Sequence, residues 1–211
     1  MFGDPVTNPM GWEVKRLSDF VKVRSSKRIY QREQTLEGVP FLRVSDLVSR
    51  IVDGIDVCDL YISEKLYDSF VNQGLTPKPG DILVTSRGTL GLCYIVNKID
   101  KFYFQDGMIS WLDKQENVID SVYLAYLFMS NEIKMQIEQI STGSTVNYLS
   151  LVNLEKIKIL SPPLPLQIRF ADFVKQADKS KFVLQKGLEK LGNIFNFTLT
   201  IKGICCNLIT K

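Results

Sequence analysis

Histidine is absent from this 211-residue chain. A nucleophile activated by a histidine base is therefore excluded, as is a metal site with imidazole ligands. The sequence also lacks a GxxxxGKS or GxxxxGKT phosphate loop and a GxGxxG turn that opens a helix after a strand. Ser161-Pro162-Pro163-Leu164 lacks the polar donor and the aromatic side chain of the Pro-Pro motif in amino-methyltransferases. An enzyme with this sequence would have to rely on scattered carboxylates that form no recognisable group.

Cysteine is scarce, with four residues and no CxxC pair or other metal-like spacing. Reduced thiols of a cytosolic protein are the expected state. Residues 1–20 lack the apolar core of a signal peptide, and the longest apolar run, residues 122–129, is too short to span a bilayer. We therefore expect a cytoplasmic protein with no metal site.

Charge is nearly balanced, with a formal net charge of +3. Such a small excess does not by itself indicate a nucleic-acid-binding protein, so a claim of that kind must rest on local clusters of basic residues. Hydrophobic residues make up 45% and charged residues 23% of the chain, which is sufficient for a sizeable core. One domain with an appendage fits this length and composition.

A proline-rich stretch, residues 161–165, separates an irregular region from a segment with clear helical periodicity. Proline interrupts a helix interior, so we expect a long helix to begin just after Pro165. Its apolar side chains predict either a helix packed back on its own domain or a coiled-coil stem that pairs with a partner. Residues 196–201 alternate in a way that suits a strand as well, which leaves the end of the chain open. The stripe on this helix consists of Phe170, Phe173, Ala177, Leu184, Leu188 and Leu191.

The region before the prolines predicts an α+β fold, with a mixed β-sheet and packed helices. Ser63 is a suitable N-cap for a short helix over residues 63–70. A longer amphipathic helix is expected from Asp120 or Ser121 to about Ile140. Strands are expected at residues 39–44, on both sides of a glycine-rich loop within 78–96, and at 102–104, 108–112 and 157–160.

The densest basic segment is residues 21–32, which contains five cations and no acid, with Tyr30 among them. Lysine and arginine side chains that displace counterions supply much of the affinity for a DNA backbone. A solvated loop is the alternative interpretation. Arg87 in the glycine-rich loop and Gln105 carry planar groups that suit guanine and adenine edges. The candidate DNA-binding residues are Lys22, Arg24, Lys27, Arg28, Tyr30, Arg43, Arg87, Thr89, Gln105, Ser144, Asn147 and Tyr148.

Several short motifs occur in a specific order along the chain. They are Gly11 to Phe20, Val39 to Val44 with Asp46, Pro79 to Leu83 followed by Gly88 and Gly91, and Asn147 to Pro165 continued by Leu166-Gln167. Together they resemble the specificity subunit of type I restriction-modification systems, over residues 11–191.

This resemblance implies a target recognition domain at residues 11–161, a conserved long helix at 162–196 and an uncertain tail at 197–211. It implies sequence-specific recognition of double-stranded DNA without catalysis by this chain. Adenine methylation would come from modification subunits that use S-adenosylmethionine and dock on the helix, and cleavage from a restriction and translocase subunit. No cofactor would be bound by this chain.

A full-length subunit of the family that this sequence resembles contains two recognition domains and two helices in one chain, whereas this chain has one of each. We therefore expect a half-subunit, native or truncated, that pairs antiparallel with a second copy or a second half-subunit through the helix. A stand-alone DNA nuclease or methyltransferase remains an alternative, and so does a protein-interaction module that dimerises through its stem without binding DNA.

Overall fold

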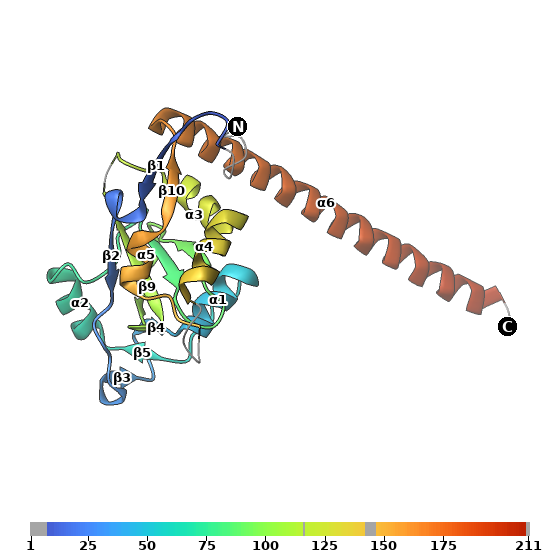
Figure 1. Cartoon of the computed structure of the whole chain (residues 1–211). Helices are drawn as coiled ribbons and strands as arrows, with labels where there is room; N and C mark the ends of the chain where they lie inside the picture. Colours follow the sequence, from blue (N-terminus) through green and yellow to red (C-terminus); the bar gives the residue numbers. More distant parts are fainter. Residues whose placement is uncertain (1–7, 116, 142–146, 210–211) are drawn as a thin grey trace. The chain divides into compact units, whose positions relative to one another are not determined.

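The computed structural model describes residues 8–115, 117–141 and 147–209, and Figure 1 shows their arrangement along the chain. By their internal contacts the residues form two compact units, Met1–Ile168 and Arg169–Lys211. The first unit contains both strands and helices, which confirms the α+β fold class. The second unit is helical.

The centre of the first unit is an antiparallel four-stranded sheet of order β2-β9-β6-β7. A second four-stranded sheet, β3-β5-β4-β8, is mixed because β4 and β8 pair in parallel. β1 and β10 form a separate antiparallel ribbon. The strand bounds are β1 (Glu13–Arg16), β2 (Val21–Ser25), β3 (Gln34–Thr35), β4 (Val39–Leu42), β5 (Tyr61–Ile62), β6 (Ile82–Thr85), β7 (Cys93–Ile95), β8 (Tyr103–Phe104), β9 (Ile109–Lys114) and β10 (Lys158–Ser161).

Two hydrophobic clusters hold the sheets together. One surrounds Trp111 and Phe104, and the other contains Phe70 stacked on Tyr103 with ring centroids 4.6 Å apart. Consecutive residues Tyr103 and Phe104 thus belong to different clusters, because side chains of a strand alternate between its faces. β8 therefore links the two halves of the core.

Helix α2 (Glu64–Asn72) confirms the prediction of a helix capped by Ser63, whose side chain accepts a hydrogen bond from the Leu66 amide. Helix α1 (Val44–Val52) was not expected from the sequence. It is capped by Arg43 and Asp46, an arrangement that does not follow the usual pattern of a small polar N-cap residue. The other short elements are η1 (Leu17–Asp19), η2 (Gln31–Glu33) and α5 (Leu151–Lys156).

The prediction of a single helix from residue 120 to 140 is wrong. The structure has two helices, α3 (Ser121–Met129) and α4 (Asn131–Ser141), separated by Ser130 in an extended conformation. The Ser130 hydroxyl accepts a hydrogen bond from the Ile133 amide at 3.4 Å, so serine starts a new helix instead of continuing the old one. The N-cap at Asp120 is as expected, since its carboxylate accepts from two amides of the first turn.

Helix α6 (Leu164–Ile209) begins slightly earlier than expected, so Pro165 lies within its first turn. Proline is tolerated there, since the first amides of a helix have no intrahelical partner. The start is fixed by buried Gln167, whose Nε2 donates to the Pro162 carbonyl at 2.8 Å. Its Oε1 accepts from the Asp120 amide at 2.9 Å, which joins the start of α6 to the start of α3.

The backbone of α6 is helical up to Ile209, so the strand alternative for residues 196–201 is wrong. Phe173 and Leu184 of the apolar stripe are 62% and 69% exposed in the isolated chain, and Ala177 is exposed as well. The side chains of Leu188 and Leu191 lie outside the described residues. No described helix combines the length and the apolar character needed to cross a bilayer.

Candidate nucleic-acid interface

Four segments meet where β2 ends and β9 begins. The Ser86 amide donates to the Met108 carbonyl at 2.8 Å, and the Leu149 amide donates to the Ser86 carbonyl at 3.0 Å. Arg87 forms an isolated antiparallel bridge with Tyr148. These contacts join segments 86–89, 105–108 and 147–149, and the pairing of Ser25 with Ser110 places segment 25–28 beside them. We call these four segments the loop cluster.

The turn at 105–108 is tied to its neighbours on both sides. The Gln105 amide donates to the Leu42 carbonyl at 2.9 Å, and the Gly107 amide donates to the Ser25 hydroxyl at 3.2 Å. Gly107 has a φ of 66°, a left-handed conformation that favours glycine. The turn is therefore a fixed part of the loop cluster.

The arginines predicted to bind DNA fall into two groups, and Arg24 belongs to the first. Its Nη1 lies 2.8 Å from Asp113 Oδ2, and its Nη2 donates to the Gly74 carbonyl at 3.2 Å. The guanidinium carbon lies 4.2 Å from the centre of the Trp111 ring. Arg24 is thus held by an acid, a carbonyl and an aromatic face, and its charge is neutralised within the fold.

Arg43 is held in the same way at the start of α1. Its Nε and Nη2 each lie 3.1 Å from a carboxylate oxygen of Asp46, and Nη2 is 3.4 Å from Asp59. The hydrogen bond and the negative charge of Asp46 raise the pKa of the Arg43 guanidinium above its usual value. The Arg43 amide also donates to Asp46, so this pair caps the helix.

Arg28 and Arg87 form the second group. Arg28 contacts Asp106 through Nε alone, at 3.0 Å, and its side chain is 68% exposed. Arg87 is exposed and donates through Nη1 to the Met108 sulfur at 3.8 Å, a weak acceptor. Both arginines keep guanidinium nitrogens that bond no other described residue, and both belong to the loop cluster.

Of the remaining basic-segment residues, Lys27 belongs to the loop cluster, whereas Lys22 and Tyr30 lie outside it. Lys22 lies opposite Asp113 in the sheet, three positions from Ser25 and about 10 Å away along the strand. The Lys27 ammonium lies 5.7 Å from the centre of the Phe70 ring. Exposed Tyr30 stacks with Arg32, which the site prediction did not include, at 5.3 Å.

The polar residues predicted to bind DNA also differ in their surroundings. Gln105 points its Oε1 at the Val44 amide, 3.4 Å away at the start of α1. Thr89 and Asn147 are exposed, and Tyr148 is 38% exposed beside Arg87. Ser144 lies outside the described residues.

Buried Asp81 holds the Trp111 ring on which Arg24 packs, a role that we did not predict. Its Oδ2 accepts from Trp111 Nε1 at 2.9 Å and from the Lys78 amide at 2.7 Å, while Oδ1 accepts from the Lys114 amide at 3.0 Å. A carboxylate in a Pro-Gly-Asp turn before a buried strand is the sequence signal that could have indicated this role. Asp81 fixes both the turn and the indole ring.

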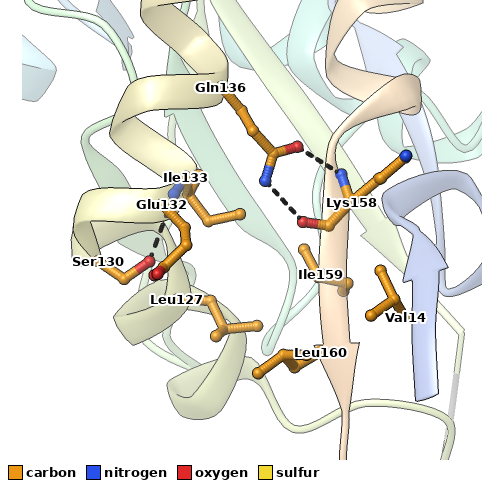
Figure 2. Close-up of a pocket in the computed structure, with 9 residues that line it drawn as sticks. All are labelled: Val14, Leu127, Ser130, Glu132, Ile133, Gln136, Lys158, Ile159 and Leu160. Carbon is orange, nitrogen blue, oxygen red and sulfur yellow. Dashed lines mark hydrogen bonds between the residues drawn. The ribbon is translucent and has the colours of Figure 1, made fainter. Parts of the chain in front are cut away.

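A shallow pocket lies elsewhere on the first unit, between α3, α4 and the β1–β10 ribbon (Figure 2). The Gln136 amide closes one side by bonding both the amide and the carbonyl of Lys158, at 2.8 and 2.9 Å. The pocket has a volume of about 120 Å³, whereas typical small-molecule sites occupy about 300 to 1,000 Å³. Among the described residues no group of three or more histidine, cysteine, aspartate or glutamate side chains could hold a metal ion.

An α+β domain that presents arginine side chains from clustered loops is of the class that suits recognition of a polyanion. Residues 9–191 match the family described as type I restriction modification DNA specificity domain, so the chain belongs to this family. The resemblance of the sequence motifs to this family is thereby confirmed.

Relatives carry the same description. A protein of Haemophilus influenzae named as a type I restriction enzyme specificity subunit is 30% identical over 83% of this chain and 43% of its own length. The MjaIX specificity subunit of Methanocaldococcus jannaschii is 29% identical over 79% of this chain and 38% of its own length. The chain thus spans less than half the length of these relatives.

Solved structures share the fold. The HsdS subunit of Thermoanaerobacter tengcongensis superposes with a TM-score of 0.58 at 18% identity, over 85% of this chain and 40% of that subunit. A chain from a structure of an assembled type I restriction-modification system gives a TM-score of 0.60 at 19% identity, over 85% of this chain and 41% of its own length.

Proposed function

We propose that this chain recognises a specific sequence in double-stranded DNA as part of a type I restriction-modification complex. The observation that carries the proposal is the family match over residues 9–191. The named relatives are specificity subunits, and the loop cluster supplies a surface where arginines face solvent. This chain directs the reaction and does not catalyse it.

Arg28 and Arg87 are the residues we assign to DNA. Arg28, on an exposed loop, contacts phosphate, and such contacts give affinity without sequence information. Arg87 contacts a base edge, because among the described residues its guanidinium bonds only a weak sulfur acceptor and can form a bidentate pair with guanine. Tyr148 and Asn147 border the same contact surface, and Gln105 faces the start of α1.

The partners in this proposal are modification subunits and a restriction and translocase subunit in the cytoplasm. The modification subunits bind S-adenosylmethionine, methylate adenine and dock on α6. No cofactor is bound by the recognition domain itself.

Mapping of methylated bases in the host genome, with and without this gene, tests the proposed function. Loss of one methylated sequence motif on deletion is the expected result, and its return requires the gene in trans. An unchanged set of methylated motifs, together with equal binding of purified protein to all duplexes, would contradict a role in specificity.

We also propose that α6 pairs antiparallel with α6 of a second copy through the exposed side chains of Phe173 and Leu184. A two-fold pair carries two identical heads and therefore binds an interrupted palindrome. Residues 166–191 span about 40 Å at 1.5 Å per residue, close to the 34 to 36 Å of one DNA turn.

Light scattering of the purified chain tests this pairing. Leu184→Asp is expected to convert a dimer into a monomer, because it places a charge in an apolar seam. Lys179→Asp, a charge change at a polar position of the same helix, serves as the control and is expected to remain dimeric. An asymmetric methylated motif, with this chain as the sole specificity subunit, would overturn the homodimer.

A further inference from the structure

Asp106 is an acid inside the loop cluster, where a DNA-binding surface is expected to exclude negative charge. Its side chain is only 23% exposed, and it lies in the turn that the Gln105 and Gly107 amides fix to β4 and β2. The fold therefore fixes the backbone that carries its carboxylate, and that carboxylate contacts Arg28. Such an acid restrains the side chain that it contacts, which here is Arg28.

The contact with Arg28 uses one edge of the guanidinium. Asp106 Oδ2 accepts from Nε at 3.0 Å, while Nη1 and Nη2 bond no described residue. Arg24 differs, because its terminal nitrogens are the ones that bond Asp113 and the Gly74 carbonyl. Asp106 thus restrains the Arg28 side chain and leaves its terminal nitrogens available.

We propose that Asp106 is a positioning residue, which holds Arg28 by Nε so that Nη1 and Nη2 face a DNA phosphate. This inference rests on the proposed function, since it presumes that the loop cluster contacts DNA. A long arginine side chain loses rotamer freedom when it binds, and a restraint already present in the free protein removes part of that cost. Asp106 therefore increases affinity for DNA although it carries the same charge as the phosphate.

Charge repulsion alone predicts that removal of Asp106 changes DNA affinity in the opposite direction, which makes the inference testable. A carboxylate about 6 Å from a phosphate in water repels it enough to weaken binding about threefold, so its removal would strengthen binding. Removal of a positioning residue weakens binding instead. The direction of the change separates the two roles.

The experiment measures affinity of the full chain for fluorescently labelled duplexes over a range of salt concentrations. One duplex carries the methylated motif of the host and the other a scrambled sequence. Asp106→Ala is expected to weaken binding to both duplexes by about three- to tenfold and to lower the salt dependence toward that of Arg28→Ala. The double variant is expected to bind no more weakly than Arg28→Ala alone, because the two residues act as a unit.

Two conservative variants separate position from charge. Asp106→Asn keeps an acceptor oxygen for Arg28 Nε and removes the negative charge, so it is expected to bind at least as tightly as the wild type. Asp106→Glu keeps the charge but moves the carboxylate by one methylene, and it is expected to weaken binding. Asp68→Ala removes an exposed acid of α2 that forms no ion pair with a described residue, and it serves as the control for net charge.

Tighter binding by Asp106→Ala, or full affinity of Asp106→Glu, would overturn the inference while leaving the proposed function intact. A wild-type chain that binds neither duplex would contradict the proposed function, and the inference would fail with it. Melting curves show whether each variant is folded. If Asp106→Ala does not fold, the comparison of Asp106→Glu with Asp106→Asn decides the question.

Discussion

Arg24 and Arg28 are neighbours in the same basic segment, yet the fold uses them differently. Arg24 lies on the central sheet, where Asp113, the Gly74 carbonyl and the Trp111 ring surround its guanidinium. Arg28 lies on the loop that follows, held at one nitrogen and otherwise exposed. Under the proposed function, the residue of this pair that is available to a DNA phosphate is Arg28, whose terminal nitrogens bond no described residue.

The largest expected effect comes from a substitution of Asp81, which holds the Trp111 ring beneath Arg24. Asp81→Ala removes a buried carboxylate that accepts three hydrogen bonds and leaves the Trp111 indole and two amides without their partner. We expect the free energy of unfolding to fall by about 3 to 5 kcal/mol. Urea denaturation measures this loss.

A matched acid on the surface provides the control for that experiment. Asp68 is exposed, and Asp68→Ala is expected to change stability by less than about 0.5 kcal/mol. Equal midpoints for Asp81→Ala and Asp68→Ala would mean that the placement of the Trp111 ring does not depend on Asp81.

The exposed arginine of the glycine-rich loop gives the next largest effect. Arg87→Ala is expected to reduce discrimination at one base pair of the target by about 1 to 3 kcal/mol, because a bidentate contact with guanine is lost. Competition binding with duplexes that differ at single positions measures this effect. Uniform weakening across all duplexes would instead assign Arg87 to the DNA backbone.

A smaller effect is expected at the second held arginine. Arg43→Ala removes an ion pair with Asp46 whose arginine side chain is 39% exposed. Solvent screens such a pair, so we expect a loss of about 0.5 kcal/mol of stability, with little change in DNA affinity. Thermal melting and duplex titration together test this, and a large loss of affinity would place Arg43 with the exposed group.

The sequence predicted the elements with strong local signals. The helix after Ser63 was predicted because serine is a favoured N-cap, and the strands around the glycine-rich loop were predicted from apolar runs bounded by turns. Helix α1 was missed because its cap is an arginine and aspartate pair. The break at Ser130 was missed because apolar periodicity continues across it.

The candidate site was predicted by residue type and by the resemblance to a family, but its division into two groups of arginines could not be. The acid that pairs with Arg24 is 89 residues away in the sequence, and the acid that pairs with Arg28 is 78 residues away. Asp113 is brought to the basic segment by the pairing of β2 with β9, and Asp106 by the turn before β9 that bonds Ser25. Only the fold determines which nitrogens each acid contacts.

The most direct test of this account compares Arg24→Ala with Arg28→Ala in two measurements, the salt dependence of DNA binding and the free energy of unfolding. Arg28→Ala is expected to lower the slope of log affinity against log salt by about 1 without loss of stability. Arg24→Ala is expected to leave the slope unchanged and to lower stability by about 1 to 2 kcal/mol. Equal loss of slope in both variants, or a greater loss for Arg24→Ala, would contradict the account.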